Sequence, residues 1–358
     1  MTVLIIDSSY LIFRSYFAYP HLNTGDTPTG AFFGFAKTTL ALIKEYSPEY
    51  TVFAKDLPTP TWRHLIHKEY KAGRPEADKE MIAQIPIIHG WSQKVSKNCF
   101  AVEGFEADDI IFSTALESAL DENVLKSEII NKPEISLFSE NSNKADHLKL
   151  LSLSQTPPKN ENQVYIFSSD KDLFQLLILP NIYFIRADNK GKFSLFGAAE
   201  FIEKYQVKAI QWLDYKALVG DGSDNLKGLN GIGPKTATKI LNQIGNLYSL
   251  AKELNLETNG FDRSYYELNQ SEKEKLGEFI RDVKNQKFLE NFTTNYDKLK
   301  LTYNLGALQL VPKTSLILEK LNLENGNEDF VKYNFKSLLP AVKSAKIQQE
   351  KGEQEELF

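Results

Sequence analysis

The chain has 358 residues, 42% hydrophobic and 25% charged, with a net charge of −5, as is typical of a globular protein of about two domains. No apolar run approaches the roughly 20 residues of a membrane span, and the N-terminus lacks the basic and apolar regions of a secretion signal. Cys99 is the only cysteine, which excludes an internal disulfide and predicts a cytoplasmic location, while the acidic balance argues against a nucleic-acid binder unless many acids are metal ligands.

Short apolar runs followed by acids recur in the first part of the chain. Residues 3–6 predict a buried strand that ends in Asp7, and residues 50–54 predict a second strand with Asp56 just beyond it. Residues 31–46, between them, have helical periodicity. Acids just past the carboxyl ends of parallel strands stand where open α/β sheets build their sites. Alone, Asp7 could equally be the N-cap of a helix.

Residues 62–74 are rich in basic and aromatic side chains. If the segment is helical, spacings of four, four and three place near one face Arg63, His67, Lys71 and Arg74. Basic groups interleaved with aromatics suit phosphate contact and base stacking. The alternative is a solvated, charged helix face.

Three carboxylates lie within four residues at Glu106, Asp108 and Asp109, after a predicted turn at Gly104 and at the start of a predicted helix. A first helical turn favours acids, which accounts for one or two of them. Three such charges repel unless protons or cations neutralise them, and oxygen-rich clusters suit Mg²⁺ or Mn²⁺. The cluster therefore predicts a metal site if other acids converge on it.

The rest of the chain divides into three predicted parts. Residues 121–163 are polar and irregular, which predicts an insertion within an α/β catalytic domain over 1–206. Further strands are predicted at 164–167 and 182–185, and two acids follow the first of these, Asp170 and Asp172. A helical domain is predicted over 207–340, and a disordered polar tail over 341–358.

The helical part begins with Asp221 and Asp224, followed by a Gly-Ile-Gly turn with a lysine and a threonine, formed by Gly231, Gly233, Lys235 and Thr236. This pattern is typical of a helix–hairpin–helix, whose glycines let backbone amides approach a DNA phosphate. A plain turn is the alternative.

Nine acids thus stand at strand ends, helix starts or turns: Asp7, Asp56, Glu106, Asp108, Asp109, Asp170, Asp172, Asp221 and Asp224. Two Mg²⁺ ions among them would activate a water and stabilise the leaving oxygen of a phosphodiester. No Cys/His cluster predicts a zinc site, and no Walker loop predicts a nucleotide site.

Six stretches in this order resemble the 5′-nuclease family of bacterial 5′–3′ exonucleases, N-terminal domains of DNA polymerase I and flap endonucleases. They are LIIDSSYLIFR (4–14), TPTGAFFGF (27–35), DLPTPTWRHLIHKEYKAGR (56–74), GFEADD (104–109), SSDKDLFQLL (168–177) and YKALVGDGSDNLKGLNGIGPKTA (215–237), with a weaker match at NFKSLL (334–339). One departure is Lys55, since relatives usually have Phe immediately before the acid at Asp56. The insertion is the other departure.

The resemblance implies a PIN-like, mostly parallel sheet with a helical arch, followed by an all-helical helix–hairpin–helix domain. The first of two metal ions would be held by Asp7, Asp56, Glu106, Asp108 and Asp109. The second would be held by Asp170, Asp172, Asp221 and Asp224. Both ions would be Mg²⁺, which Mn²⁺ replaces in some conditions.

The resemblance also implies contacts with nucleic acid. Lys71 and Arg74 match basic residues that engage the 5′ strand at the arch and take part in catalysis, Tyr70 a neighbouring aromatic and Arg14 a DNA-contacting arginine. Arg63 joins them by its spacing. In relatives, the helix–hairpin–helix grips duplex DNA and binds K⁺.

These implications predict a monomeric, stand-alone 5′–3′ exonuclease or flap endonuclease that acts on DNA 5′ ends, flaps and RNA–DNA hybrids in replication and repair. It would leave a 5′-phosphate and a 3′-hydroxyl. The alternatives are a catalytically weak DNA-binding module, which would be expected to lack several of the acids, and a PIN-type ribonuclease, which does not account for residues 207–340.

The last residues form a separate motif. The string of Gln354, Leu357 and Phe358 resembles the short peptide by which bacterial replication proteins dock on the β sliding clamp. Large apolar residues in a polar tail are typical of anchors for a partner's pocket. The alternative is a chance match.

Overall fold

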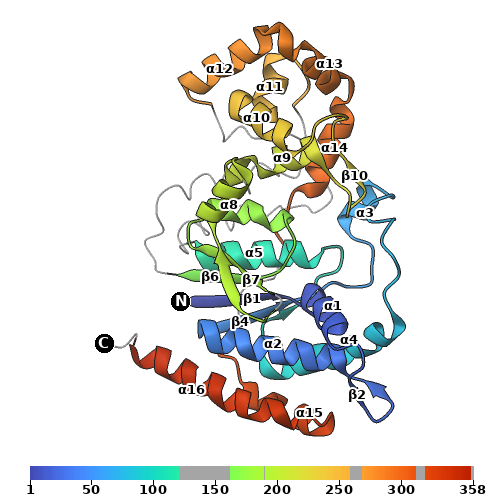
Figure 1. Cartoon of the computed structure of the whole chain (residues 1–358), viewed down its shortest axis with the longest axis vertical. Coiled ribbons are helices and arrows are strands. Elements are labelled where there is room, and N and C mark those ends of the chain that lie inside the picture. Colours follow the sequence, from blue (N-terminus) through green and yellow to red (C-terminus); the bar gives the residue numbers. More distant parts are fainter. Residues whose placement is uncertain (121–161, 189, 259–267, 312–318, 356–358) are drawn as a thin grey trace.

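A mostly parallel six-stranded sheet forms the centre of the computed structural model, which describes residues 1–120, 162–188, 190–258, 268–311 and 319–355. All neighbouring strands are parallel except the last pair (Figure 1). In sheet order the strands are β5 (Cys99–Phe100), β4 (Tyr50–Ala54), β1 (Thr2–Asp7), β6 (Gln163–Phe167), β7 (Ile182–Ala187) and β8 (Phe193–Phe196). The predicted strands are confirmed.

The central strand β1 explains the position of the predicted acids. Residues 3–6 have no exposed surface, as expected for a parallel strand that is covered on both faces. The register pairs Asp7 with Ala54 of β4 and Ile6 with Phe167 of β6. The three strands therefore end together, and the residues that follow them meet at one edge of the sheet.

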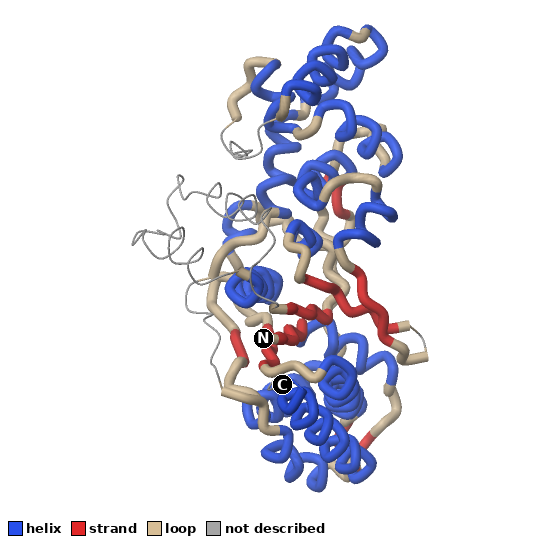
Figure 2. The backbone as a smooth tube through the Cα atoms, turned by 90° about the vertical axis from the view of Figure 1, so that its left-hand side faces the viewer, coloured by secondary structure: helices blue, strands red, loops and turns tan. Residues whose placement is uncertain are grey.

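Helices cover both faces of the sheet (Figure 2). One face packs against α1 (Ser8–Ala18), α2 (Gly30–Tyr46), α4 (Lys79–Val95) and α16 (Leu339–Glu355). The other packs against α5 (Ala107–Ala119), the 3₁₀ helix η2 (Asp172–Ile178) and α8 (Ala198–Tyr205). A two-stranded hairpin of β2 (Asn23–Thr24) and β3 (Thr27–Pro28) lies between α1 and α2 in the chain.

A helical domain follows and lies beyond one end of the sheet domain (Figure 1). It starts with η3 (Ala209–Gln211), α9 (Trp212–Val219) and a short hairpin of β9 (Gly220–Asp221) and β10 (Leu226–Lys227). It continues with α10 (Pro234–Ile244), α11 (Leu247–Glu253), α12 (Gln270–Arg281), η4 (Val283–Asn285), α13 (Gln286–Thr294) and α14 (Tyr296–Gly306). Helix α14 returns toward the sheet domain and packs on α9.

The structure of the C-terminal part differs from two predictions. Residues 319–338 do not belong to the helical domain: η5 (Leu323–Gly326), α15 (Asn327–Lys332) and η6 (Lys336–Leu338) pack on the sheet domain, where the rings of Phe330 and Trp91 lie 5.7 Å apart. The predicted disordered tail is wrong over the described residues, because α16 packs on α2 and buries Val342 and Ala345. Gln349 Nε2 also donates to Pro48 O at 3.1 Å.

The structure also differs from the prediction for the basic segment, residues 62–74. Only α3 (Trp62–Ile66) is helical, and turns and extended chain lead from it to α4. His67 has an extended backbone, and Lys71 has a φ of +56°, so neither continues the helix. The predicted common helix face of residues 63–74 is therefore not formed. No helix in the described residues is both long and apolar enough to span a membrane.

Candidate active site

Four of the predicted acids meet at the carboxyl edge of the sheet, each from a different strand or the segment after it. Asp7 ends β1, Asp56 follows β4, Asp108 lies in the first turn of α5 after β5, and Asp170 follows β6. We call these the four edge acids. Despite the unusual Lys55, Asp56 stands where the prediction placed it, because β4 ends at Ala54.

Hydrogen bonds from neighbouring loops hold these carboxylates. Asp7 accepts from Tyr10 N at 3.0 Å and from Ser168 Oγ at 2.7 Å, so it is also the N-cap of α1. Asp56 accepts from Ser9 Oγ at 2.6 Å and from Ala107 N at 2.8 Å. Asp7 thus stands at the end of its strand and also caps α1, and the two serines, which the sequence analysis gave no role, hold the carboxylates of Asp7 and Asp56.

The charges of the edge acids act on one another. Burial, with the nearby charges of Asp56 and Asp170, raises the pKa of Asp7 from 3.8 to about 7. Burial and the charges of Asp170 and Asp7 raise the pKa of Asp108 well above its usual value. Negative charge at this edge thus exceeds what the surrounding protein compensates, which is the condition that protons or cations relieve.

Removal of the Asp7 charge is expected to change the pH dependence of stability in metal-free protein. The folded chain holds this proton to about pH 7, whereas the usual pKa is 3.8. Between these values the folded state binds more protons than the unfolded state, so the free energy of unfolding falls as the pH rises. In EDTA, Asp7→Asn should be more stable than wild type at about pH 8 by a few kcal/mol, and by much less at about pH 4.5. Urea titrations measure both differences, and a pH-independent difference would contradict the expectation.

A second group of acids surrounds a buried lysine. Lys216, on α9, is 7% exposed and forms ion pairs with Asp172 and Asp221. Burial opposes ionisation of Asp221, but the Lys216 ammonium and hydrogen bonds from Ser223 lower its pKa to about 2. The sequence analysis gave Lys216 no role. The signal that could have found it is a lysine within a largely apolar helix five residues before a site acid.

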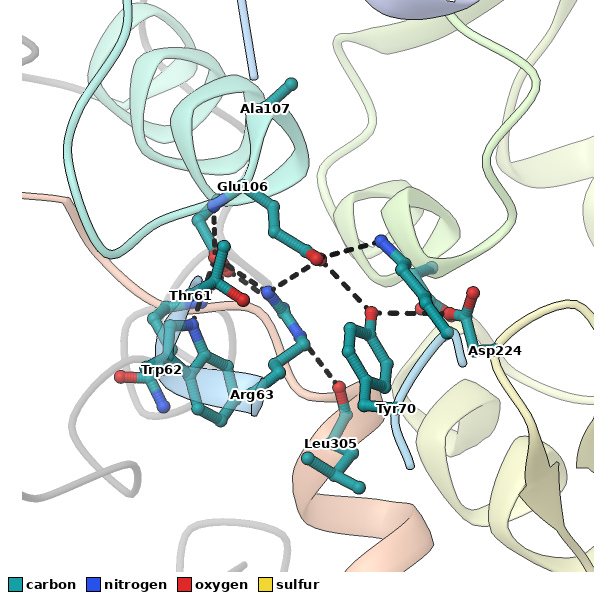
Figure 3. Close-up of polar contacts among 12 residues, drawn as sticks. Thr61, Trp62, Arg63, Tyr70, Glu106, Ala107, Asp224 and Leu305 are labelled. Atoms are coloured by element: carbon teal, nitrogen blue, oxygen red, sulfur yellow. Dashed lines mark hydrogen bonds and ion pairs between the residues drawn. The ribbon is translucent and has the colours of Figure 1, made fainter. Parts of the chain in front are cut away.

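A third group links the central acidic cluster to the helical domain (Figure 3). Glu106 accepts from Tyr70 Oη at 3.1 Å and from Lys71 Nζ at 2.9 Å. Asp224 accepts from Arg74 Nη2 at 2.8 Å and lies 3.4 Å from Tyr70 Oη. Lys71 and Arg74 are therefore brought to Glu106 and Asp224, although not by a continuous helix.

Arg63 lies fully within the protein and uses all five of its N–H groups. Nε donates to Leu305 O at 2.9 Å, and Nη2 donates to Ala307 O at 3.0 Å and to Asp109 Oδ1 at 2.9 Å. Nη1 donates to Asp109 Oδ2 at 2.8 Å and to Glu106 Oε2 at 3.1 Å. This single side chain thus joins α3, the start of α5 and the end of α14 (Figure 3).

These contacts bear on the predictions for Arg63, Tyr70 and Asp109. Arg63 is 2% exposed and has no free donor for a phosphate, and Tyr70 is 3% exposed and has no open ring face for a base. Both side chains have structural partners here, and their contact with nucleic acid stays a prediction. Asp109 has no exposed surface and accepts from Arg63, Trp62 Nε1 and Gln309 N. It is the counterion of Arg63, and its role as a metal ligand stays a prediction.

The predicted helix–hairpin–helix turn lies on the surface of the helical domain. Gly231 has a φ of +79°, and Gly233 is the N-cap of α10, with open space around the position of a Cβ at both. Lys235 and Thr236 are exposed in the first turn of this helix. At the other domain, Arg14 Nη2 makes only a long contact of 3.4 Å with Asp188 O. The role of these residues in nucleic-acid binding stays a prediction.

Two further predictions concern metal and partner sites. Within the described ranges, no three acidic, histidine or cysteine side chains converge tightly enough to form a ready metal site. The four edge acids nevertheless offer carboxylate oxygens, the pKa of Asp7 and of Asp108 is raised, and such a set of donors fits a hard divalent cation. The predicted partner residues, Gln354, Leu357 and Phe358, lie outside the residues whose side chains the structure describes.

Comparison with known proteins identifies related sequences. The chain matches "5′-3′ exonuclease, N-terminal resolvase-like domain" over residues 2–132 and "5′-3′ exonuclease, C-terminal SAM fold" over residues 207–329. It is 32% identical to the 5′-3′ exonuclease of Mycoplasmopsis pulmonis, with 89% of each chain covered. It is also 32% identical to the 5′-3′ exonuclease of Aquifex aeolicus, with 70% of this chain and 72% of the relative covered. The DNA polymerase I of Deinococcus radiodurans is 31% identical over 90% of this chain, which spans 28% of the polymerase.

Solved structures share the fold. T5 5′-exonuclease with bound divalent metal ions (zinc) has a TM-score of 0.55 at 18% identity and covers 93% of this chain and 99% of its own. A T5 flap endonuclease pseudo-enzyme–product complex with DNA and metal ions has a TM-score of 0.55 at 18% identity, with 98% and 100% covered. The predicted fold class, a mostly parallel sheet domain followed by a helical domain, is confirmed. With both domains matched and relatives covered over most of their length, the chain belongs to the 5′–3′ exonuclease family.

Proposed function

We propose that this chain is a Mg²⁺-dependent nuclease that hydrolyses phosphodiesters near 5′ ends or at 5′-flap junctions. The observation that carries the proposal is the convergence of Asp7, Asp56, Asp108 and Asp170 at one edge of the sheet, where burial and the neighbouring carboxylates raise the pKa of Asp7 and of Asp108. The names of its relatives, 5′-3′ exonucleases, support the direction of action. The neighbouring T5 structures with divalent ions and DNA support the cofactor class and the substrate.

The four edge acids would hold one ion, and Asp172, Asp221 and Asp224 would contribute to a second. When bound, the divalent ions supply a water of lowered pKa and offset the negative charge that develops on the phosphate. Mn²⁺ would serve as well, because carboxylate oxygens suit both metals. Lys216 pairs with Asp172 and Asp221, and its ammonium helps to lower the pKa of Asp221 to about 2, so the Asp221 carboxylate is ionised before an ion binds.

Lys71 and Arg74 would bind the phosphate that is cleaved. Lys71 Nζ lies 2.9 Å from Glu106 Oε1, and Arg74 Nη2 lies 2.8 Å from Asp224 Oδ1. Half of the Arg74 side chain is exposed. Both cations therefore stand among the acids and can exchange a carboxylate for a phosphate oxygen without a large movement. Tyr70 fixes the loop from which they project, through its bond to Glu106.

The helical domain would hold the duplex part of the substrate. The exposed turn of Gly231 and Gly233 offers backbone amides at the start of α10, and Lys235 adds a positive charge. K⁺ at this turn, and contact of Arg14 with DNA, belong to the same proposal. Action on RNA–DNA hybrids, a role in replication and repair, and docking of residues 354–358 on a sliding clamp are further parts of it.

One assay tests the proposed function. Labelled substrates with a 5′ flap, a nick, an RNA–DNA hybrid or single-stranded RNA are incubated with Mg²⁺, with Mn²⁺ or with EDTA. We expect 5′-phosphate and 3′-hydroxyl products from the first three substrates with either metal and none in EDTA. Full cleavage in EDTA would contradict the metal mechanism. Cleavage of single-stranded RNA alone would favour a PIN-type ribonuclease, and binding without cleavage would favour a DNA-binding module.

A further inference from the structure

Three basic side chains beside the edge acids have no acidic partner among the described residues. Arg186, at the end of β7, is partly buried, and its guanidinium lies 3.5 Å from the centre of the Phe196 ring and 5.8 Å from that of Phe174. Within the described ranges, none of its N–H groups makes a hydrogen bond, whereas Arg63 uses all five. Stacking holds the plane of the guanidinium and leaves its donor edge open.

Lys204 and Lys171 stand around the same aromatic cluster. Lys204, in the last turn of α8, is exposed and lies 5.4 Å from the centre of the Tyr205 ring. Lys171 is exposed in the loop after β6, where its carbonyl accepts from Trp212 Nε1 at 2.6 Å. The rings of Tyr205 and Trp212 lie 4.8 Å apart, so the three cations lie around one aromatic cluster. Burial lowers the pKa of Lys204, and the positive charges of Arg186 and Lys171 lower it further.

Two acids close to Arg186 and Lys204 in the chain accept hydrogen bonds from backbone amides. Glu200, one helical turn before Lys204, accepts from Gly197 N at 2.8 Å. Asp188, two residues after Arg186, accepts from the backbone amides of Lys190 and Lys192 at 2.8 and 2.9 Å. The positive charge of the cluster is therefore left for an external anion.

We propose that Lys171, Arg186 and Lys204 form a phosphate-binding subsite for the backbone of a nucleic-acid strand, beside the edge acids on the β7 side of the sheet. The subsite rests on the proposed function, because it extends the path of that substrate. Its position follows from the chain: Lys171 lies between Asp170 and Asp172, and β7 is the neighbour of β6 in the sheet. A planar, pre-oriented Arg fork and two Lys point charges are the groups that bind phosphate oxygens, and the contact would carry no base specificity.

The double variant Arg186→Gln/Lys204→Gln tests the proposal in the full chain. We expect it to bind a labelled 5′-flap DNA in EDTA roughly tenfold more weakly than wild type, because charged hydrogen bonds to phosphate are lost. The dependence of log affinity on log salt should flatten by about 0.9 for each phosphate contact removed. Fluorescence anisotropy at several salt concentrations measures both quantities. Lys171 is left unchanged, because it adjoins two site acids.

Two matched variants complete the experiment. Lys37→Gln/Lys332→Gln removes two lysines that also lie over aromatic rings, but on α2 and α15 at the other face of the sheet, and it should bind as wild type does. The charge-retaining Arg186→Lys/Lys204→Arg should keep most of the affinity. Wild-type affinity and salt slope in the Gln double variant, or an equal loss in the control, would overturn the subsite. If wild type binds this DNA through the subsite but cleaves no substrate with Mg²⁺, the subsite stands and the proposed function fails.

Discussion

Asp170→Asn is expected to reduce turnover by roughly a hundredfold or more while the chain stays folded. Asp170 is one of the four edge acids, and its charge raises the pKa of both Asp7 and Asp108. The substitution removes a carboxylate from the proposed metal set and relieves repulsion at the same place. Asparagine keeps the carbonyl oxygen that accepts from Asp172 N at 2.7 Å, so the loop after β6 should hold its shape. Single-turnover cleavage of a flap substrate and a thermal melt measure the two effects.

The matched control for this variant is Asp109→Asn, the same chemical change in the same acidic region. Asp109 has no exposed surface and is the counterion of Arg63, so its substitution should lower stability. Cleavage by Asp109→Asn, measured well below its melting temperature, should exceed cleavage by Asp170→Asn. The reverse order would show that Asp109, as the sequence predicts, serves the metal and that our structural assignment is wrong.

Arg63→Met is expected to lower the free energy of unfolding by about 3–5 kcal/mol. Methionine fills much of the space, but it leaves Glu106 and Asp109 buried without their guanidinium partner. It also removes the donors from the carbonyls of Leu305 and Ala307 at the end of α14. A buried charge without a partner destabilises the folded state by more than the intact ion pair stabilises it, because neither water nor another group solvates that charge. Urea unfolding followed by circular dichroism measures the difference.

Arg74→Met is the control for this prediction. Arg74 also pairs with a site acid, Asp224 at 2.8 Å, but half of the Arg74 side chain is exposed whereas Asp224 is buried, so the pair is partly solvated. We therefore expect Arg74→Met to lose clearly less stability than Arg63→Met while its cleavage falls. Equal losses of stability in the two variants would remove the distinction between a structural and a substrate-binding arginine.

The sequence by itself determined the strands and the acids that follow them. The apolar runs at residues 3–6 and 50–54 are local signals, and parallel strands bring their carboxyl ends to one edge whatever the loops between them do. The positions of Asp7, Asp56 and Asp170 therefore followed from short stretches of sequence. Asp108 followed from another signal, the cluster of carboxylates at the start of a predicted helix, which the structure contains as α5.

Only the tertiary structure decided which acids lie in the candidate site and which pair with buried groups that stabilise the fold. Arg63 finds its partners 43, 46, 242 and 244 residues away, and no local pattern tells a buried arginine from an exposed one. Asp108 and Asp109 are neighbours in the chain, but the helix turns them to different surroundings. One faces the charges of Asp7 and Asp170, and the other faces a guanidinium from α3. Spacing shows that carboxylates are available, whereas the packing of distant segments sets what each of them meets.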